Sequence, residues 1–170
     1  KTRRNRAGGV NDALYEKIRM INVGEAFKWD LLGSKRYVGE LAERYPPRAI
    51  NKLTPTIKDI HIKNFIVESA EKILSVNGIP EIPCSNVLIE NGKINSKKLI
   101  GALNDVDGFT FRNLNIYGKK IAGYGLVNNF EGVGLSGMAV EIDNVTLKSG
   151  SSTLKAGLLG ANKTMSAYAG

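Results

Sequence analysis

Hydrophobic residues recur in a nine-residue pattern that appears five times along the chain. In the clearest copy, residues 59–67, the apolar side chains are Ile60, Ile62, Phe65 and Val67, with Asn64 between the two pairs. Each pair alternates with a period of two, which is the spacing of a β-strand. The five copies occupy residues 12–20, 59–67, 86–94, 108–116 and 139–147.

The polar residue between the two apolar pairs is expected to mark a bend. It is asparagine at positions 64, 91, 113 and 144, separated by 27, 22 and 31 residues, and Lys17 takes its place in the first copy. Asparagine adopts left-handed backbone more readily than most residues, and its side-chain amide can bond an equivalent amide on a stacked neighbour. Each copy therefore predicts a strand, a bend and a second strand, with the bend asparagines in a ladder.

One such copy cannot enclose a core, so successive copies are expected to stack. The pattern predicts an all-β fold, a right-handed parallel β-helix (solenoid) of about five coils. Leucine-rich repeats fit the spacing, but no copy has Leu-x-x-Leu-x-Leu, and an antiparallel sandwich is disfavoured because the copies repeat in one sense. Stacking predicts two columns of equivalent residues, which are Ala13, Ile60, Val87, Phe109 and Val140, and Tyr15, Ile62, Ile89, Phe111 and Ile142.

Two stretches depart from the repeat. Residues 33–56 are polar and contain Tyr45-Pro46-Pro47, which a central strand does not accommodate. We interpret them as an inserted loop with one or two helical turns near residues 38–44, whose Arg, Lys and Tyr side chains suit sugars or acids. The domain organisation predicted is residues 1–148 as coils with this insertion, followed by a Gly/Ser/Ala-rich C-terminal tail over 149–170 that is loose or extended.

Charge is concentrated toward the beginning of the chain. The net charge is +8, and residues 1–63 hold 14 Lys/Arg against 7 Asp/Glu, whereas residues 64–170 hold 10 against 9. A basic end favours an anionic partner, for which a nucleic acid, an anionic lipid surface and an acidic polysaccharide are all candidates. Nucleic acid is the least favoured of these, because no aromatic side chains for base stacking are interleaved with the basic run.

The remaining composition excludes several classes of protein. Cys84 is the only cysteine, so no intrachain disulfide is possible, and we expect it to be a small buried residue at the entry to a strand. No apolar run reaches the length of a transmembrane helix, and no apolar stretch follows the basic start as in a secretory signal peptide. The sequence indicates neither a metal nor a cofactor.

Five short motifs, taken in order, carry a family resemblance. They are Lys1-Thr2, Arg4-x-Arg6-x-Gly8, Ile18-x-Met20-x-Asn22-Val23, Thr54-Pro55-x-Ile57-x-Asp59-Ile60, and Val76-Asn77-Gly78 ahead of Asn86-Val87. This order resembles the later part of glycoside hydrolase family 28, the polygalacturonase family of pectin-degrading β-helices, over about residues 1–147. The resemblance implies a secreted, periplasmic or cell-surface protein acting on pectin or oligogalacturonides.

The family's reaction is an inverting hydrolysis that needs one carboxylic acid and one carboxylate base. In the family these groups lie in Asn-Thr-Asp and Asp-Asp motifs beside Gly-His-Gly, all upstream of an Arg-Ile-Lys tripeptide, and none of the three motifs occurs here. His61, the only histidine, lacks flanking glycines, and Asp105 and Asp107 look like turn residues. We therefore expect no catalytic residue in this chain, which alone should not hydrolyse a glycosidic bond.

The basic start is the expected substrate-binding site. Lys1 falls on the lysine of the family's sugar-binding tripeptide, and the planar guanidinium of arginine grips carboxylates at two points. We expect Lys1, Arg3, Arg4 and Arg6 to attract uronate carboxylates of an acidic polysaccharide. This makes the chain one wall of a substrate cleft, completed by upstream coils of the same β-helix.

A non-catalytic alternative stays open. The same repeat would suit a β-helical carbohydrate-binding or structural module of the adhesin or tailspike type. Such a module should have a closed, capped first coil, whereas a missing upstream part would leave an open strand edge.

Overall fold

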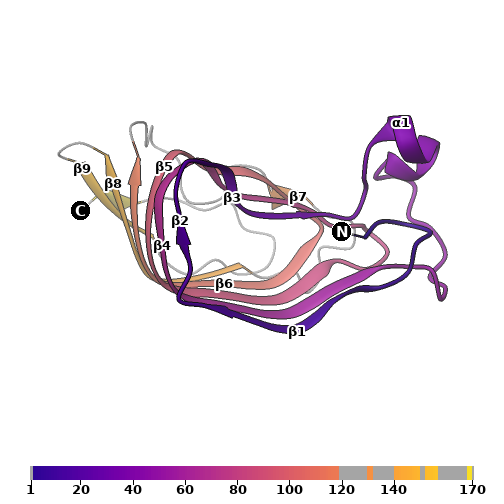
Figure 1. Cartoon of the computed structure of the whole chain (residues 1–170), viewed down its shortest axis with the longest axis horizontal. Coiled ribbons are helices and arrows are strands. Elements are labelled where there is room, and N and C mark those ends of the chain that lie inside the picture. The colour runs from indigo at the N-terminus through magenta and orange to yellow at the C-terminus, as the bar shows by residue number, and fades with distance from the viewer. Residues whose placement is uncertain (1, 119–129, 132–139, 150–151, 157–167, 170) are drawn as a thin grey trace.

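The computed structural model describes residues 2–118, 130–131, 140–149, 152–156 and 168–169 (Figure 1). These residues form mostly β-strands with one short α-helix and one 3-10 turn. The elements are β1 Gly9–Glu16, β2 Arg19–Met20, β3 Val23–Asp30, α1 Lys35–Val38, η1 Gly39–Ala42, β4 Thr56–Asn77, β5 Cys84–Asn104, β6 Val106–Gly118, β7 Phe130–Glu131, β8 Val140–Ser149, β9 Ser152–Ala156 and β10 Tyr168–Ala169.

The long strands stack in parallel and bend together. The sheet runs in the order β1-β4-β5-β6-β8-β9-β10, with parallel pairing from β1 to β8, while β2 and β3 also pair with β4 in parallel. In Figure 1 the ribbons of β1, β4, β5 and β6 follow one another around the same curve. The prediction of an all-β fold built on parallel stacking is confirmed.

Both predicted columns of apolar residues are confirmed residue by residue. Ala13 lies opposite Ile60, Ile60 opposite Val87, and the same register continues to Phe109 and Val140. The second column runs in register from Tyr15 through Ile62, Ile89 and Phe111 to Ile142. The central members of both columns are buried, so the alternating pattern sets which face of each strand points inward.

The predicted bends fall where the backbone is left-handed. Asn64, Asn91 and Asn113 have φ of 56°, 54° and 49°, and Lys17 has φ of 57° at the same place in the first copy. Asn113 Nδ2 donates to Asn91 Oδ1 at 3.2 Å, which is one step of the expected amide ladder. The bend ladder is therefore confirmed at this pair of neighbouring strands.

A second left-handed column begins each copy, and the sequence pattern did not reveal it. Asp12, Asp59 and Asn86 have φ of 55°, 55° and 51°, and Gly108 takes the same place with φ of 62°. Asn86 Nδ2 donates to Asp59 Oδ1 at 2.6 Å, and this hydrogen bond lowers the pKa of the Asp59 carboxyl. Each copy is thus held between two bends.

The left-handed backbone at Asn64 gives a direct test of the bends. Replacing Asn64 with glycine should leave the free energy of unfolding within about 0.5 kcal/mol, because glycine adopts this conformation without strain. Replacing it with alanine should lower that free energy by about 1 kcal/mol, because a Cβ disfavours left-handed backbone. Urea denaturation measures both, and equal values for the two variants would contradict a backbone origin.

Apolar side chains fill the interior between the bent strands. Phe65, Phe109 and Phe111 are among the largest fully buried side chains, and the Phe27 and Phe65 rings meet edge to face with centroids 5.2 Å apart. Cys84 is fully buried at the start of β5, as expected, and burial raises the pKa of its thiol to about 12. This cysteine is a packing residue and stays a thiol at neutral pH.

The insertion and the tail depart from the parallel stack. Residues 33–56 hold α1 and η1, so the helical turns begin at Lys35, a few residues before the stretch predicted. In the 149–170 tail, β9 pairs antiparallel with β8, and β10 with β9. The other residues of that tail, 150–151, 157–167 and 170, lie outside the described part of the chain.

Candidate functional site

The basic start of the chain lies at the outer edge of the stack. Among the described residues, β1 pairs with β4 alone, so its other edge faces outward. The segment leading into β1 is fixed by backbone hydrogen bonds from Ala7 N to Leu53 O and from Arg4 N to Leu31 O. Lys1, the residue that falls on the family's sugar-binding tripeptide, lies outside the described residues.

Arg4 is a structural residue, which corrects its assignment to substrate binding. Its side chain is 3% exposed and forms a two-point ion pair with Glu81, from Nε at 2.6 Å and from Nη2 at 2.7 Å. It also donates to the backbone carbonyls of Leu41, Glu43 and Arg44. These contacts use all five N–H groups of the guanidinium, so none is left for a uronate.

The Glu81 carboxyl stays charged in this buried ion pair with Arg4. Burial alone would raise the pKa of its carboxyl, but hydrogen bonds from Arg4 and from the backbone outweigh burial and leave that pKa lowered. The carboxylate is therefore charged at neutral pH, although its side chain is 4% exposed. Arg4 and Glu81 together fasten the basic segment to the connection between β4 and β5.

A second buried ion pair fastens the insertion to the connection between β5 and β6. Arg44 Nε and Nη2 donate to Asp105 Oδ2 and Oδ1 at 2.7 and 2.9 Å, and the Asp105 side chain is 1% exposed. Asp105 has φ of 49°, which confirms it as a turn residue. It anchors Arg44, and it does not form an acid/base pair with Asp107.

Arg6 remains a candidate for substrate binding. Its side chain is exposed and borders an open hollow of about 880 Å³ at the β1 and β3 edge. Lys28 and Asp30 of β3 also line this hollow, and Tyr15 and Trp29 give it aromatic surface. Lys28 Nζ is held by Glu25 Oε2 at 2.6 Å, so Arg6 is the cation of this lining that is left for an acidic sugar beside the aromatic surface.

Arg3 is partly buried and lies against the insertion. A Cβ added to Gly33 would come within 3.0 Å of Arg3 Cδ, so the aliphatic part of Arg3 passes close over this glycine. Gly33 has φ of 78°, and Asp30 Oδ1 accepts hydrogen bonds from the backbone N–H groups of Leu32 and Gly33 at 3.1 Å each. Arg3 therefore helps to seat the start of the insertion.

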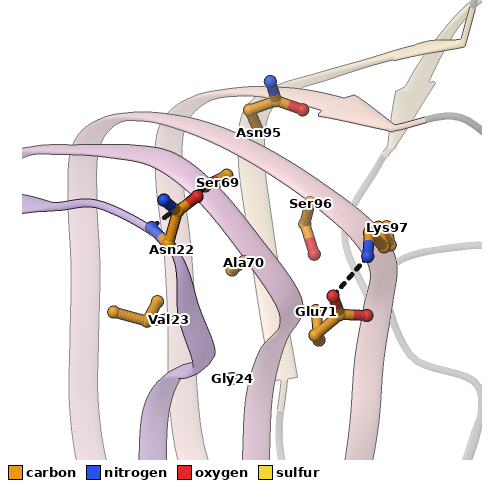
Figure 2. Close-up of a pocket in the computed structure, with 9 residues that line it drawn as sticks. All are labelled: Asn22, Val23, Gly24, Ser69, Ala70, Glu71, Asn95, Ser96 and Lys97. Carbon is orange, nitrogen blue, oxygen red and sulfur yellow. Dashed lines mark hydrogen bonds and ion pairs between the residues drawn. The ribbon is translucent and has the colours of Figure 1, made fainter.

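A smaller groove crosses neighbouring strands at residues 22–24, 69–71 and 95–97 (Figure 2). Its volume is about 360 Å³, and its lining includes small side chains such as Ala70 and Ser96. Ser69 donates to Asn22 Oδ1 at 2.6 Å, and an ion pair joins Lys97 to Glu71. Because its polar groups are paired with one another, this groove offers fewer open contacts than the hollow at Arg6.

His61 belongs to a row of charged residues on the outer face of the stack. His61 Nε2 lies 2.8 Å from Glu90 Oε1, and Arg112 Nη1 lies 3.7 Å from Glu90 Oε2. Lys63 lies opposite Glu90 in the register of β4 and β5. On its other side it lies opposite Glu16 of β1, and its Nζ is 3.5 Å from Glu16 Oε2. These residues give His61 a cross-strand partner, and its setting on a strand remains unlike the glycine-flanked histidine of the family.

Comparison with protein-family models, with curated proteins and with solved structures finds no match for this chain. Within the part that the structure describes, no three His, Cys, Asp or Glu side chains are grouped so that they could hold a metal ion. No helix of the described residues has the length and apolar character needed to span a membrane.

Proposed function

We propose that this chain is the C-terminal part of a right-handed parallel β-helix that hydrolyses pectic polysaccharides. It supplies one wall of the substrate cleft, and the catalytic carboxylates come from upstream coils of the same β-helix. The observation that carries the proposal is the hollow at the outer edge of β1, where the exposed Arg6 borders the same space as Trp29 of β3. Arg6 belongs to the motifs that resemble glycoside hydrolase family 28.

The open edge supports this proposal over the capped binding or structural module. Among the described residues, β1 has a strand partner on one side only, and Leu14 and Tyr15 on it are 56% and 44% exposed. Strand edges left bare invite pairing with further strands, so a capped module would cover this one. An upstream coil stacked on β1 would bury Tyr15 in the same column as Ile62.

Arg4 has no part in the proposed binding role, because its guanidinium is fully engaged. Arg6, Lys1 and Arg3 stay in the proposed set, and Lys28 of β3, which pairs with Glu25, is left out of it. A uronate polymer carries one carboxylate on each sugar, so cations along the cleft wall would bind it by charge-assisted hydrogen bonds.

Binding to polygalacturonate tests the proposal. The chain should bind polygalacturonate more tightly than fully methyl-esterified pectin, which has the same sugar backbone without the charge, and binding should weaken with added salt. Arg6→Met should weaken binding about tenfold, the loss of one charge-assisted hydrogen bond of about 1.4 kcal/mol. Arg19→Met is the matched control, because Arg19 is exposed and pairs with Glu68 away from the hollow.

Hydrolysis is tested separately by release of reducing ends. The 170-residue chain should release none, and a longer chain that includes the upstream carboxylates should release them from polygalacturonate. The proposal is wrong if the longer chain neither binds nor cleaves any pectic polymer. Salt-sensitive binding to DNA without binding to polygalacturonate would also overturn it.

A further inference from the structure

Charged residues alternate in sign along one column that crosses the parallel strands. Glu16 of β1 lies opposite Lys63 of β4, Lys63 lies opposite Glu90 of β5, and Glu90 lies opposite Arg112 of β6. The backbone register continues to another acidic residue, Asp143 of β8. Because paired strands are about 4.8 Å apart, neighbours in this column are close enough for their charges to interact. We call Glu16, Lys63, Glu90 and Arg112 the charge column.

Two contacts show that neighbours in the charge column meet. Lys63 Nζ lies 3.5 Å from Glu16 Oε2, and Arg112 Nη1 lies 3.7 Å from Glu90 Oε2. Opposite charges on facing residues of neighbouring strands stabilise their pairing, whereas like charges destabilise it. The charge column therefore favours neighbouring strands that bring opposite signs together.

The charge column ends at Glu16, on a strand edge that is open. Within the part of the chain that the structure describes, β1 has β4 as its one strand partner, and β1 is the outermost ribbon of this layer in Figure 1. The Glu16 side chain is 39% exposed. Backbone N–H and C=O groups along such an edge can pair with a further strand, and the side chains then decide which strand fits. Lys or Arg opposite Glu16 would continue the alternation.

Among the described residues, the interior is also uncovered at this end of the stack. Tyr15 belongs to an inward-facing column in which Ile62 and Ile89 are 3% and 1% exposed, but Tyr15 itself is 44% exposed. Ala13, in the other inward-facing column, is only partly buried against the core. A strand with apolar residues opposite Ala13 and Tyr15 would extend both columns and bury these side chains.

A strand suits this edge better than a helix does. The backbone groups of an α-helix are bonded within the helix, so they cannot pair with the edge of β1. Successive side chains of a strand point to opposite faces, so a strand can present apolar residues opposite Ala13 and Tyr15 on the inner face and a cation opposite Glu16 on the outer face.

We propose that β1 pairs with a parallel strand of the upstream coil, which carries Lys or Arg opposite Glu16 and apolar residues opposite Ala13 and Tyr15. That this strand belongs to the same β-helix rests on the proposed function. The requirement for a cation rests on the charge column, and the requirement for apolar residues rests on the exposed interior at Tyr15.

Residues 56–67 of β4 supply a probe for this edge, because Ile60, Ile62 and Lys63 stand at the three required positions. A peptide of this sequence with blocked ends, and its Lys63→Glu variant, are titrated into the full chain up to millimolar concentration while NMR spectra follow the backbone amides of β1. The Lys63 peptide should bind about fivefold more tightly than the Lys63→Glu peptide. The net charge of the chain, +8, favours the opposite order, so this preference would identify local pairing.

Variants of the chain test whether Glu16 is the origin of the preference. Glu16→Lys should reverse it, and Glu16→Gln, the milder change, should abolish it. Glu40→Lys is the matched control, because it makes the same change of charge at an exposed residue of η1 and should leave the preference as in the parent chain. Circular dichroism shows whether each variant remains folded.

Three results would overturn this partner strand. They are the absence of amide shifts in β1 with either peptide, equal binding of the two peptides, and an unchanged preference in both Glu16→Lys and Glu16→Gln. Self-association of the chain in analytical ultracentrifugation, with protection of the β1 amides, would make a second copy the partner and would also overturn it. Peptide pairing without polygalacturonate binding would support the partner strand and contradict the proposed function, and the reverse would contradict the partner strand alone.

Discussion

Replacing Arg4 with methionine is expected to lower the free energy of unfolding by about 3–5 kcal/mol, the largest loss for any charged residue of the basic segment. The variant would leave the Glu81 carboxylate buried without its partner, and it would leave three backbone carbonyls without their donor. Breaking a buried ion pair from one side is costly because the remaining charge loses both its partner and water. Urea denaturation monitored by circular dichroism measures the change.

The matched control is Arg19→Met. Arg19 and Glu68 form an ion pair whose side chains are 66% and 38% exposed, so its loss should cost less than about 1 kcal/mol. The double variant Arg4→Met/Glu81→Leu should be more stable than Arg4→Met, because it removes the buried carboxylate that Arg4→Met leaves without a partner. If Arg4→Met costs no more than Arg19→Met, the assignment of Arg4 as a structural anchor is wrong.

The same pair predicts a dependence on pH. In the protein, the lowered pKa of Glu81 adds stability that is present at neutral pH and is lost as the pH falls through that pKa. In Arg4→Met, burial would instead raise the pKa of Glu81, so protonation in the folded state would stabilise the variant at acidic pH. The difference between the two proteins should therefore be largest near pH 7 and smaller near pH 4.

The stacked columns could be predicted because strand spacing and burial act on each copy locally. Alternation with a period of two decides which side chains point inward, and equivalent positions in successive copies then meet. This is why the register from Ala13 to Val140 follows from the pattern alone. The bend at Asn64 was also predictable, because asparagine tolerates left-handed backbone and stands where the alternation changes phase.

The second bend column was missed because its residue type varies. Asp12, Asp59, Asn86 and Gly108 share a left-handed backbone but no single side chain. The available signal was that Asp, Asn and Gly are the residues that adopt this conformation most readily. A search for that class of residue at a fixed place in each copy would have found the column.

The role of Arg4 could not be predicted from its place in a basic run. Its partner Glu81 is 77 residues away, and the partner of Arg44, Asp105, is 61 residues away. Whether a charged side chain meets solvent or a buried carboxylate depends on which distant segment covers it. Here the insertion and the connections between strands cover Arg4, and Arg6, two residues later, remains exposed.

Phe65 and Gly92 should show strong coupling in a double-variant cycle. The two residues are opposite each other in β4 and β5, and a Cβ added to Gly92 would lie 2.2 Å from Phe65 Cζ. The Phe65 ring is 2% exposed and fills the space that a side chain at position 92 would take, while Phe27 supports it from another side. Glycine at 92 is thus required by the ring of Phe65.

Gly92→Ala should lower the free energy of unfolding by about 1–3 kcal/mol, because it forces the buried ring to move. Phe65→Ala should lower it by about 3–5 kcal/mol through the lost burial and the space left behind. In the double variant the new methyl group at 92 meets no ring, so the combined loss should fall short of the sum by at least about 1 kcal/mol. Urea denaturation of the three variants and the parent protein gives the coupling.

Gly24→Ala separates this packing effect from the general effect of losing a strand glycine. A Cβ added to Gly24 would meet no atom within 4 Å, and Gly24 lies in β3 of the same sheet. This control should be neutral or slightly stabilising, since alanine restricts the unfolded chain more than glycine does. If Gly92→Ala behaves like Gly24→Ala, or if the two changes at 65 and 92 are additive, the ring of Phe65 does not occupy the space above Gly92.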